Sequence, residues 1–379
     1  MNIKISLITS THNAYNQDFS VLENLLDSSG IALEVIRVND PYGSFHLNNI
    51  NCRNMRTITP PKGLGYFNSL RFGLLQTTGS YIYFLSEDTK LNDLSFFSQA
   101  VKKLNEDADL VFSRSEVSTA GHGNYIMKHP FKEQYTPAEF LREWYNLRMI
   151  FVDYFSFSSF MFRKDMLMAA EAFISSFPDA VSLDTATIIK SILLSRNIAF
   201  VDCVTATRHF RSGGRDVNDK SNMTAQVVNH FAIPLDVTSF IKKLDLSHEL
   251  ITEMKTFFNQ YAVYSFNAIT SDFYQTSNEV IFDCMDFEEL LKNRDVYIYG
   301  RGWVGLALVE YLKNAGIGVR SFIDDFKAGE GIITFDQFKN EEHRNTSVII
   351  ASYKCTDVFR IYKKLQTVGG LNIIDLLRA

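Results

Sequence analysis

The sequence predicts an α/β protein with more than one domain, and three observations lead to this prediction. Apolar, strand-like runs alternate with helix-length segments through roughly the first 85 residues. The same alternation returns near residue 295. The chain also has 379 residues, which is more than one hydrophobic core usually holds. Strands separated by helix-length segments imply right-handed crossovers and a mainly parallel sheet.

The first part of the chain supplies most of the predicted elements. Short β-prone runs predict strands, and apolar residues spaced three or four apart predict helices. The expected strands are Ile3 to Thr9, Leu33 to Val38, Tyr81 to Leu85, Asp109 to Phe112 and Ala199 to Cys203. The expected helices are Val21 to Ser28, Gly65 to Gln76, Leu94 to Leu104, Pro137 to Leu147 and Ser182 to Ser195. A basic, glycine-bearing loop, Arg208 to Arg215, is expected to follow.

The remaining chain divides into two further regions. Helical spacing without recognisable chemistry runs from about residue 236 to 292. After Asp295 we expect strands at Val296 to Tyr299, Gly318 to Ile323, Ser347 to Ala351 and Leu371 to Asp375, with helices ending at Asn314 and Leu365. The expected domains are therefore an α/β domain over residues 1–235, a helical linker over 236–293 and a small α/β domain over 294–379.

Composition excludes several classes of protein. A net charge of −5 argues against a nucleic-acid binder, which needs a basic surface to neutralise phosphates. The four cysteines are far apart, so neither a zinc site nor a disulfide framework is expected. The N-terminus enters a strand pattern without a signal peptide, and no run approaches the ~20 apolar residues that span a bilayer. We expect a cytoplasmic protein. The sequence leaves open whether it contacts the inner face of the cell membrane peripherally and whether it forms a homo-oligomer.

The strand Tyr81 to Leu85 ends abruptly in the triplet Ser86-Glu87-Asp88. A buried strand that ends in carboxylates places negative charge at the rim of an α/β sheet, where such folds bind ligands. A metal and diphosphate site is expected there. The alternative is an acidic turn without chemistry.

Three more features stand at strand ends or turns of the first domain. The first strand runs into Ser10-Thr11-His12-Asn13, and the second ends in Asn39-Asp40. Pro61-Lys62-Gly63-Leu64-Gly65 forms a turn that permits unusual backbone angles, and Thr78-Gly79-Ser80 leads into the acidic strand.

Together these features resemble the family 2 glycosyltransferases of GT-A fold, over about the first 215 residues. Thr11, Asn13 and Asn39-Asp40 match the first two motifs of that family, whereas Ser10 and His12 do not. Its Asn-x-Gly turn keeps the glycine, Gly65, but not the Asn. The lead-in Thr78 to Leu85 is the most specific match. Ser86 replaces the first acid of the Asp-x-Asp metal motif.

The resemblance implies roles for particular residues. Asp88 would ligate Mn²⁺ or Mg²⁺ together with His209, and Arg211 would contact the diphosphate. Asp184 would be the catalytic base, about 95 residues beyond the metal motif. The residues implied in nucleotide binding are Thr11, Asn13, Asp40, Gly65, Ser86 and Glu87, with Asp40 placed to accept the imide N–H of a uracil.

Two of these residues also have a purely structural interpretation. Asp184 lies near the start of a predicted helix, where an Asp stabilises the helix as a cap without any catalysis. A single histidine is more often structural than functional, but the arginines around His209 favour a diphosphate clamp.

A glycine motif, Gly300-Arg301-Gly302-Trp303-Val304-Gly305, follows a strand and precedes Asp324 by about 20 residues. This is the context of a dinucleotide-binding fingerprint. Too few residues remain for a dehydrogenase, so the segment instead resembles the small Rossmann-like domain attached to bacterial sugar-modifying enzymes. Such a domain binds a nucleotide through Gly300, Gly302, Gly305 and Asp324, or serves as a packing module.

The resemblance therefore implies an inverting, metal-dependent glycosyltransferase. It would move a sugar from a nucleotide donor, a UDP-sugar first of all, to a saccharide or lipid-linked acceptor hydroxyl in bacterial surface polysaccharide or glycolipid synthesis. The alternative is a non-catalytic nucleotide-sugar-binding or assembly protein whose transferase site has decayed.

Overall fold

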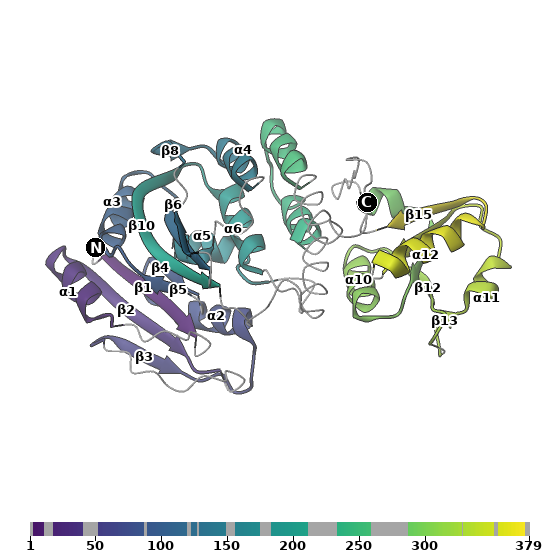
Figure 1. The fold of residues 1–379 in the computed structure, drawn as a ribbon, viewed down its shortest axis with the longest axis horizontal. Coiled ribbons are helices and arrows are strands. Elements are labelled where there is room, and N and C mark those ends of the chain that lie inside the picture. The colour runs from purple at the N-terminus through teal and green to yellow at the C-terminus, as the bar shows by residue number, and fades with distance from the viewer. Residues whose placement is uncertain are drawn as a thin grey trace. The chain divides into compact units, whose positions relative to one another are not determined.

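The computed structural model describes residues 3–10, 18–40, 52–86, 89–119, 123–126, 129–148, 156–174, 183–210, 233–258, 287–327, 329–351 and 355–375. Its contacts divide the chain into two compact units (Figure 1). The first contains Met1–Ile174 and Leu183–Asp216, and the second contains Ser175–Ser182 and Val217–Ala379. The boundaries expected after residues 235 and 293 stay predictions.

The first unit is built on one ten-stranded sheet with the order β3-β2-β1-β4-β9-β6-β10-β5, with β7 paired to β6 and β8 to β10. The strands are β1 (Ile3–Ser10), β2 (Ile31–Val38), β3 (Met55–Ile58), β4 (Tyr81–Leu85), β5 (Thr89–Leu91), β6 (Leu110–Thr119), β7 (Gly123–Ile126), β8 (Gln134–Tyr135), β9 (Phe160–Arg163) and β10 (Ile198–Phe210). Strands β3, β2, β1 and β4 are parallel. Strand β9 is antiparallel to both β4 and β6, and β6 is parallel to β10. The α/β class is confirmed, and the sheet is consistent with the GT-A type.

Helices pack on both faces of this sheet because the strands are apolar on both sides. They are α1 (Ser20–Ser28), α2 (Tyr66–Leu75), α3 (Ser95–Glu106), α4 (Pro137–Arg148), α5 (Lys164–Ala169) and α6 (Leu183–Leu194), with the 3₁₀ helix η1 (Phe157–Ser159). Tyr83 of β4 packs on Phe97 of α3, with ring centroids 4.8 Å apart. Its neighbour Phe84 points to the opposite face and packs on Phe157 of η1 at 4.9 Å. Strand β4 is therefore covered on both sides by aromatic rings.

The lead-in to β4 lies at the edge of the sheet where the parallel strands begin. Thr78 donates its backbone N–H to buried Glu34 at 2.9 Å, and Ser6 donates its hydroxyl to the same carboxylate at 2.8 Å. A Cβ on Gly79 would lie 2.5 Å from the Ser6 Oγ and 2.8 Å from the Lys4 carbonyl oxygen. Only glycine fits this close approach, so the most specific sequence match to the family has a packing role.

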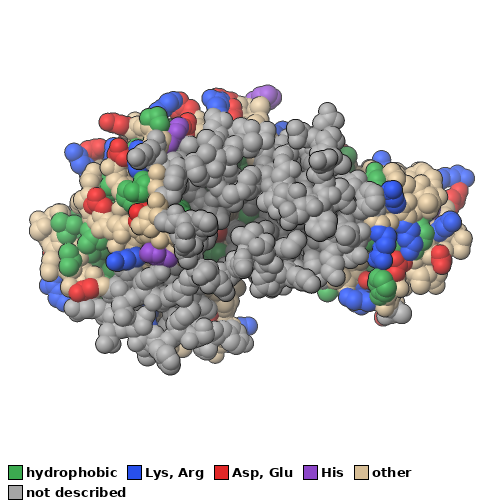
Figure 2. All heavy atoms as spheres, in the orientation of Figure 1, with side chains coloured by type: hydrophobic (Ala, Val, Ile, Leu, Met, Phe, Trp, Pro, Cys, Tyr) green, Lys and Arg blue, Asp and Glu red, His purple; other side chains and the backbone are tan. Residues whose placement is uncertain are grey.

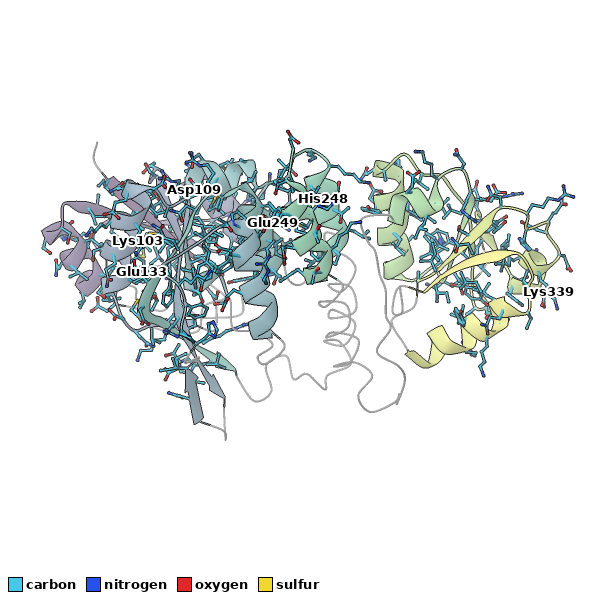
Figure 3. The ribbon with its side chains drawn as sticks, turned by 90° about the horizontal axis from the view of Figure 1, so that it is seen from above. Lys103, Asp109, Glu133, His248, Glu249 and Lys339 are labelled. Carbon is cyan, nitrogen blue, oxygen red and sulfur yellow. The ribbon has the colours of Figure 1, made fainter. Side chains whose placement is uncertain are left out.

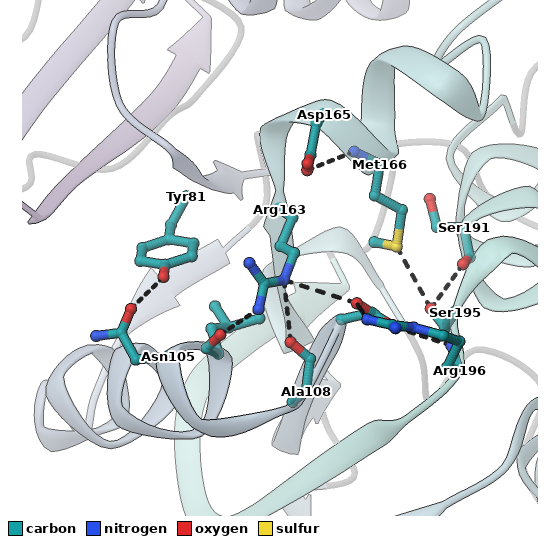
Figure 4. Close-up of polar contacts among 11 residues, drawn as sticks. Tyr81, Asn105, Ala108, Arg163, Asp165, Met166, Ser191, Ser195 and Arg196 are labelled. Atoms are coloured by element: carbon teal, nitrogen blue, oxygen red, sulfur yellow. Dashed lines mark hydrogen bonds and ion pairs between the residues drawn. The ribbon is translucent and has the colours of Figure 1, made fainter.

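A second polar cluster ties strand starts and helix ends together at the same edge (Figure 4). The Arg163 guanidinium donates to the carbonyl oxygens of Leu104 and, at 3.1 Å, of Ala108. Asp109 accepts from the backbone and side chain of Arg196 and lies 3.7 Å from Arg163. Burial raises the pKa of Asp109, but the Arg196 hydrogen bonds outweigh it and hold that pKa below its usual value. This edge is occupied by structural interactions.

The second unit contains helical residues 233–241 and 248–258 and a five-stranded parallel sheet of order β13-β12-β11-β14-β15. The strands are β11 (Asp295–Tyr299), β12 (Val319–Ile323), β13 (Ile332–Ile333), β14 (Thr346–Ile350) and β15 (Leu371–Asp375), and the helices are α9 (Phe287–Leu291), α10 (Trp303–Asn314), α11 (Phe335–Lys339) and α12 (Cys355–Gln366). This strand order corresponds to the first five strands of a doubly wound sheet.

Most predicted elements are confirmed, but the short strands β3, β5, β7, β8, β9 and β13, the helices α5 and α11 and the 3₁₀ helix η1 were not predicted. The predicted loop from Arg208 was wrong at its start, because β10 continues to Phe210 and includes His209. Strand β10 is this long because it pairs with β6 and β5. A local sequence pattern does not reveal pairing with strands that are distant in the chain.

The described surface of both units carries Lys and Arg beside Asp and Glu (Figure 2). Figure 3 shows the described side chains, among them Lys103 from α3, His248 and Glu249 from helical residues 248–258, and Lys339 from α11. Within the described parts of the chain, no helix is long and apolar enough to span a membrane.

Candidate active site

Asp40 lies two residues beyond the end of β2 and anchors the turn before α2. Its carboxylate accepts the Ser69 hydroxyl at 2.6 Å and the backbone N–H of Leu64 at 3.2 Å. The side chain is buried. Gly65 has φ +75°, a left-handed conformation that favours glycine, and it directly precedes the helix. Asp40 thus shapes the Gly63-Leu64-Gly65 turn, whatever else it binds.

Ser86 directly follows β4 and is fixed by η1. Its backbone N–H donates to the Ser158 Oγ at 3.0 Å, and the two hydroxyl oxygens are 3.1 Å apart. The hydroxyl of Tyr83 donates to the Ser158 carbonyl oxygen at 2.6 Å. Ser158 was not predicted as a site residue, and only its place in a Ser-rich, Phe-rich run hinted at it. It holds the end of the strand that leads to the acids.

Asp184 is in the first turn of α6 and is partly exposed. The N-terminal turns of α6 are held by Phe173, which follows α5 and donates its backbone N–H to the Thr187 hydroxyl at 3.0 Å. The ring of Phe173 contacts Phe84 of β4 at 5.2 Å and Phe67 of α2 at 6.1 Å. One buried residue therefore links α6 through its backbone, and the end of β4 and the start of α2 through its ring.

His209 lies near the end of β10, and its neighbour Arg208 pairs with Thr89 of β5. Thr89 is the first described residue after the triplet Ser86-Glu87-Asp88. The antiparallel ladder between β5 and β10 therefore brings the chain that follows the acids beside the strand that carries His209.

Strand direction puts these residues on one edge of the sheet. Strands β2 and β4 are parallel and end near Asp40 and Ser86. Strand β10 runs in the same direction as β4, because β9 is antiparallel to both β4 and β6 and β6 is parallel to β10. Helix α6 connects directly to the start of β10 and runs back along the sheet, so Asp184 at its first turn lies toward the edge where β10 ends. Ligands of α/β folds bind at this carboxyl edge.

Five residues predicted for this site, Thr11, Asn13, Glu87, Asp88 and Arg211, lie outside the described residues. Over the described part of the chain, no group of three His, Cys, Asp or Glu side chains could hold a metal ion. An ion such as Mg²⁺ needs only one or two protein ligands when substrate phosphates and water complete its shell. His209 is therefore compatible with a metal held jointly with a donor diphosphate.

The glycine motif of the second unit is explained largely by its backbone. Gly300 has φ +104°, and a Cβ on Gly305 would lie 2.2 Å from the Gly300 carbonyl oxygen. A Cβ on Gly302 would meet nothing within 4 Å. Fold packing thus requires two of the three glycines, and Gly302 at the start of α10 faces open space.

Asp324 closes the glycine loop within the described network, and its predicted contact with a nucleotide stays a prediction. Its carboxylate accepts the backbone N–H groups of Arg301, Phe326 and Lys327 at 2.9, 2.9 and 3.0 Å. Burial raises the pKa of Asp324, but these three donors outweigh it and keep that pKa below its usual value. The described contacts of Asp324 therefore stabilise the loop.

Comparison with known proteins adds a likeness of structure only. No family model matches the chain, and no curated protein matches its sequence. The similar solved structures include TarS 1-349 from S. aureus, at 14% identity over 82% of this chain and 80% of that one, with a TM-score of 0.49. The same TarS fragment in complex with UDP-GlcNAc is 13% identical over 87% of this chain and 95% of that one, with a TM-score of 0.42.

A third similar structure is the mannosyltransferase PcManGT from Pyrobaculum calidifontis in complex with GDP-Man and Mn²⁺. It is 11% identical over 70% of this chain and 71% of that one, with a TM-score of 0.40. All three TM-scores lie below 0.5, and the fold assignment rests on the strand order of this chain itself.

Proposed function

We propose that this protein is an inverting, metal-dependent glycosyltransferase that moves a sugar from a nucleotide donor, first of all a UDP-sugar, to an acceptor hydroxyl. Its acceptor would be a saccharide or a lipid-linked saccharide in the synthesis of bacterial surface polysaccharide or glycolipid. The acceptor class follows from the family resemblance alone.

One observation supports the proposal most strongly. The residues given roles in transfer come from distant parts of the sequence, yet Asp40, Ser86 and Asp184 gather at the carboxyl edge of the sheet, joined by the contacts of Phe173. The β5–β10 ladder places the strand that carries His209 beside the segment that follows the acids. All four positions are thus directed to the edge of the sheet where α/β folds bind their ligands.

The proposed chemistry is a single displacement at the anomeric carbon of the donor sugar. The Asp184 carboxylate takes the proton of the acceptor hydroxyl, and the oxygen of that hydroxyl bonds to the anomeric carbon. The bond between that carbon and the diphosphate oxygen breaks, and the nucleoside diphosphate leaves with the electron pair. Asp184 lies in the first turn of α6 and is partly exposed, so that an acceptor can reach it.

The residues proposed to hold Mn²⁺ or Mg²⁺ are Asp88 and His209, with Arg211 on the diphosphate. Once bound, the ion would neutralise charge on the leaving diphosphate. The Asp40-anchored turn would present a fixed backbone surface to the nucleotide, together with Thr11, Asn13, Gly65, Ser86 and Glu87.

The direct test is donor turnover with Mn²⁺ across UDP- and GDP-linked sugars, with and without oligosaccharide acceptors. Asp88→Ala should abolish metal-dependent turnover. Asp184→Asn should lower kcat by at least about 100-fold and leave binding of the nucleoside diphosphate within about twofold, since the loss of a general base affects the chemical step. A matched control is Asp336→Asn, because Asp336 is an exposed acid of α11.

The outcomes separate the two candidate functions. If wild type binds nucleoside diphosphate but turns over no donor, the enzyme proposal fails and the non-catalytic alternative replaces it. If Asp184→Asn retains full activity, the assignment of the base is wrong even though the enzyme survives.

A further inference from the structure

The segment that follows α5 has an unusual backbone for the residues it contains. Glu171 and Phe173 have φ of 50° and 59°, a left-handed conformation that non-glycine residues rarely adopt. Phe173 is only 3% exposed. Such strain costs free energy and persists where surrounding contacts impose it, and it is found disproportionately at functional sites.

The contacts that impose this conformation come from two sides. The ring of Phe173 packs against Phe84, Phe157 and Phe67, with centroids 5.2, 5.1 and 6.1 Å away. Phe84 lies two residues before Ser86, and Phe67 lies two residues after Gly65. The ring thus contacts the elements that carry the proposed donor site.

The backbone of the same segment is held by α6. Phe173 donates its N–H to the Thr187 hydroxyl at 3.0 Å, and buried Lys190 donates to the Ile174 carbonyl oxygen at 3.2 Å. Thr187 is three residues beyond Asp184, so the two side chains are neighbours on the helix surface. The backbone of Phe173 is therefore tied to the helix that carries the proposed base.

We propose that Phe173 is a positioning residue, which sets the N-terminal turn of α6, and with it Asp184, relative to the end of β4. This inference rests on the proposed function. A proton-transfer group displaced by about 1 Å can slow a reaction by about 100-fold. A smaller side chain at Phe173 would leave a cavity between β4 and α6 and free the segment to relax to right-handed angles.

The test compares Phe173→Leu with Phe97→Leu. Both remove a buried ring that packs on β4, the first through Phe84 and the second through Tyr83 on the opposite face. Both should lower the midpoint of thermal unfolding by a similar amount, about 2–4 °C. Only Phe173→Leu should also lower kcat by at least about tenfold, with the Kd for UDP within about twofold of wild type.

A second pair isolates the backbone contact. Thr187→Val removes the hydroxyl that accepts from Phe173, whereas Thr187→Ser keeps it. We expect Thr187→Val to lower kcat about three- to tenfold relative to wild type, and Thr187→Ser to keep most of the wild-type kcat. Equal kcat values for Phe173→Leu and Phe97→Leu, or for Thr187→Val and Thr187→Ser, would overturn the inference.

Amide hydrogen exchange tests the positioning role without activity. Phe173→Leu should speed exchange in the first turns of α6 and at Ser86, and Phe97→Leu should leave α6 unchanged. If wild type transfers no sugar from any donor, the proposed function fails, and exchange alone decides whether Phe173 couples α6 to β4. Unchanged exchange in α6 of Phe173→Leu would refute that coupling.

Discussion

Glu34 is predicted to stabilise the first unit strongly, and Glu34→Gln should reveal it. The side chain is 6% exposed and accepts hydrogen bonds from the Thr78 backbone at 2.9 Å and from the Thr78 hydroxyl at 2.5 Å, with the Lys4 Nζ 2.9 Å away. Burial raises the pKa of this carboxyl, but the donors outweigh it and lower the pKa from 4.5 to about 2. That difference corresponds to about 3 kcal/mol of folding free energy as an upper limit.

The pH dependence follows from the sign of this change. Because the folded-state pKa lies below the unfolded one, the stabilisation is fully present above about pH 4.5 and is lost as pH falls toward 2. Glu34→Gln should therefore lower the free energy of unfolding by about 2–3 kcal/mol at pH 7 and by less than half of that at pH 3.

Urea unfolding of wild type, Glu34→Gln and the exposed-site control Glu106→Gln at pH 7, 5, 4 and 3 provides the measurement. The control should change stability by less than about 0.5 kcal/mol. A Glu34→Gln protein that matches the control at every pH would refute the reasoning.

Three further predictions concern packing and reactivity. Gly79→Ala should lower stability by about 1–3 kcal/mol in urea unfolding, because its Cβ would overlap β1, whereas Gly318→Ala, with open space around it, should be nearly neutral; equal effects would contradict the packing role. Burial raises the pKa of the Cys203 thiol to about 11, so at pH 8 its alkylation, followed by peptide mass spectrometry, should be about 100-fold slower in folded than in unfolded protein; equal rates would mean that the thiol is accessible. Asp324→Asn should lower the unfolding midpoint of the second unit through about 1–3 kcal/mol of lost hydrogen bonding, and an unchanged midpoint relative to Asp336→Asn would show that the glycine loop does not depend on this carboxylate.

The elements that sequence alone predicts well are those with a strong local pattern. Strand β4 is a continuous apolar and aromatic run, β1 and β2 are rich in Ile, Leu and Val, and α3 places Phe97, Ala100, Val101 and Leu104 on one buried stripe. Strand β9 was missed because its Phe-rich run has no alternation, being buried on both faces between β4 and β6. Its identity as a strand depends on neighbours that are far away in the sequence.

The places of several candidate residues in the fold could be predicted for similar reasons, and their roles stay predictions. Asp40, Ser86 and Asp184 stand at strand or helix ends, which local patterns mark. The contribution of Phe173 was not predictable, since its left-handed backbone and its ring contacts arise only from tertiary packing. Thr78-Gly79 shows the opposite case, because a specific motif match marks a packing contact at the far edge of the sheet.

The pairing of β5 with β10 has a consequence for how the site forms. Thr89 and Arg208 are neighbours in the ladder although more than 100 residues separate them in the chain. Contacts this distant in sequence form late and slowly, because a long loop must close first. During synthesis, the segment after Ser86-Glu87-Asp88 has no partner strand until the ribosome has released β10. The proposed transferase site would thus be among the last parts of the first unit to be completed, and a chain truncated before β10 would leave β5, which follows the acids, without the strand that it pairs with in the described structure.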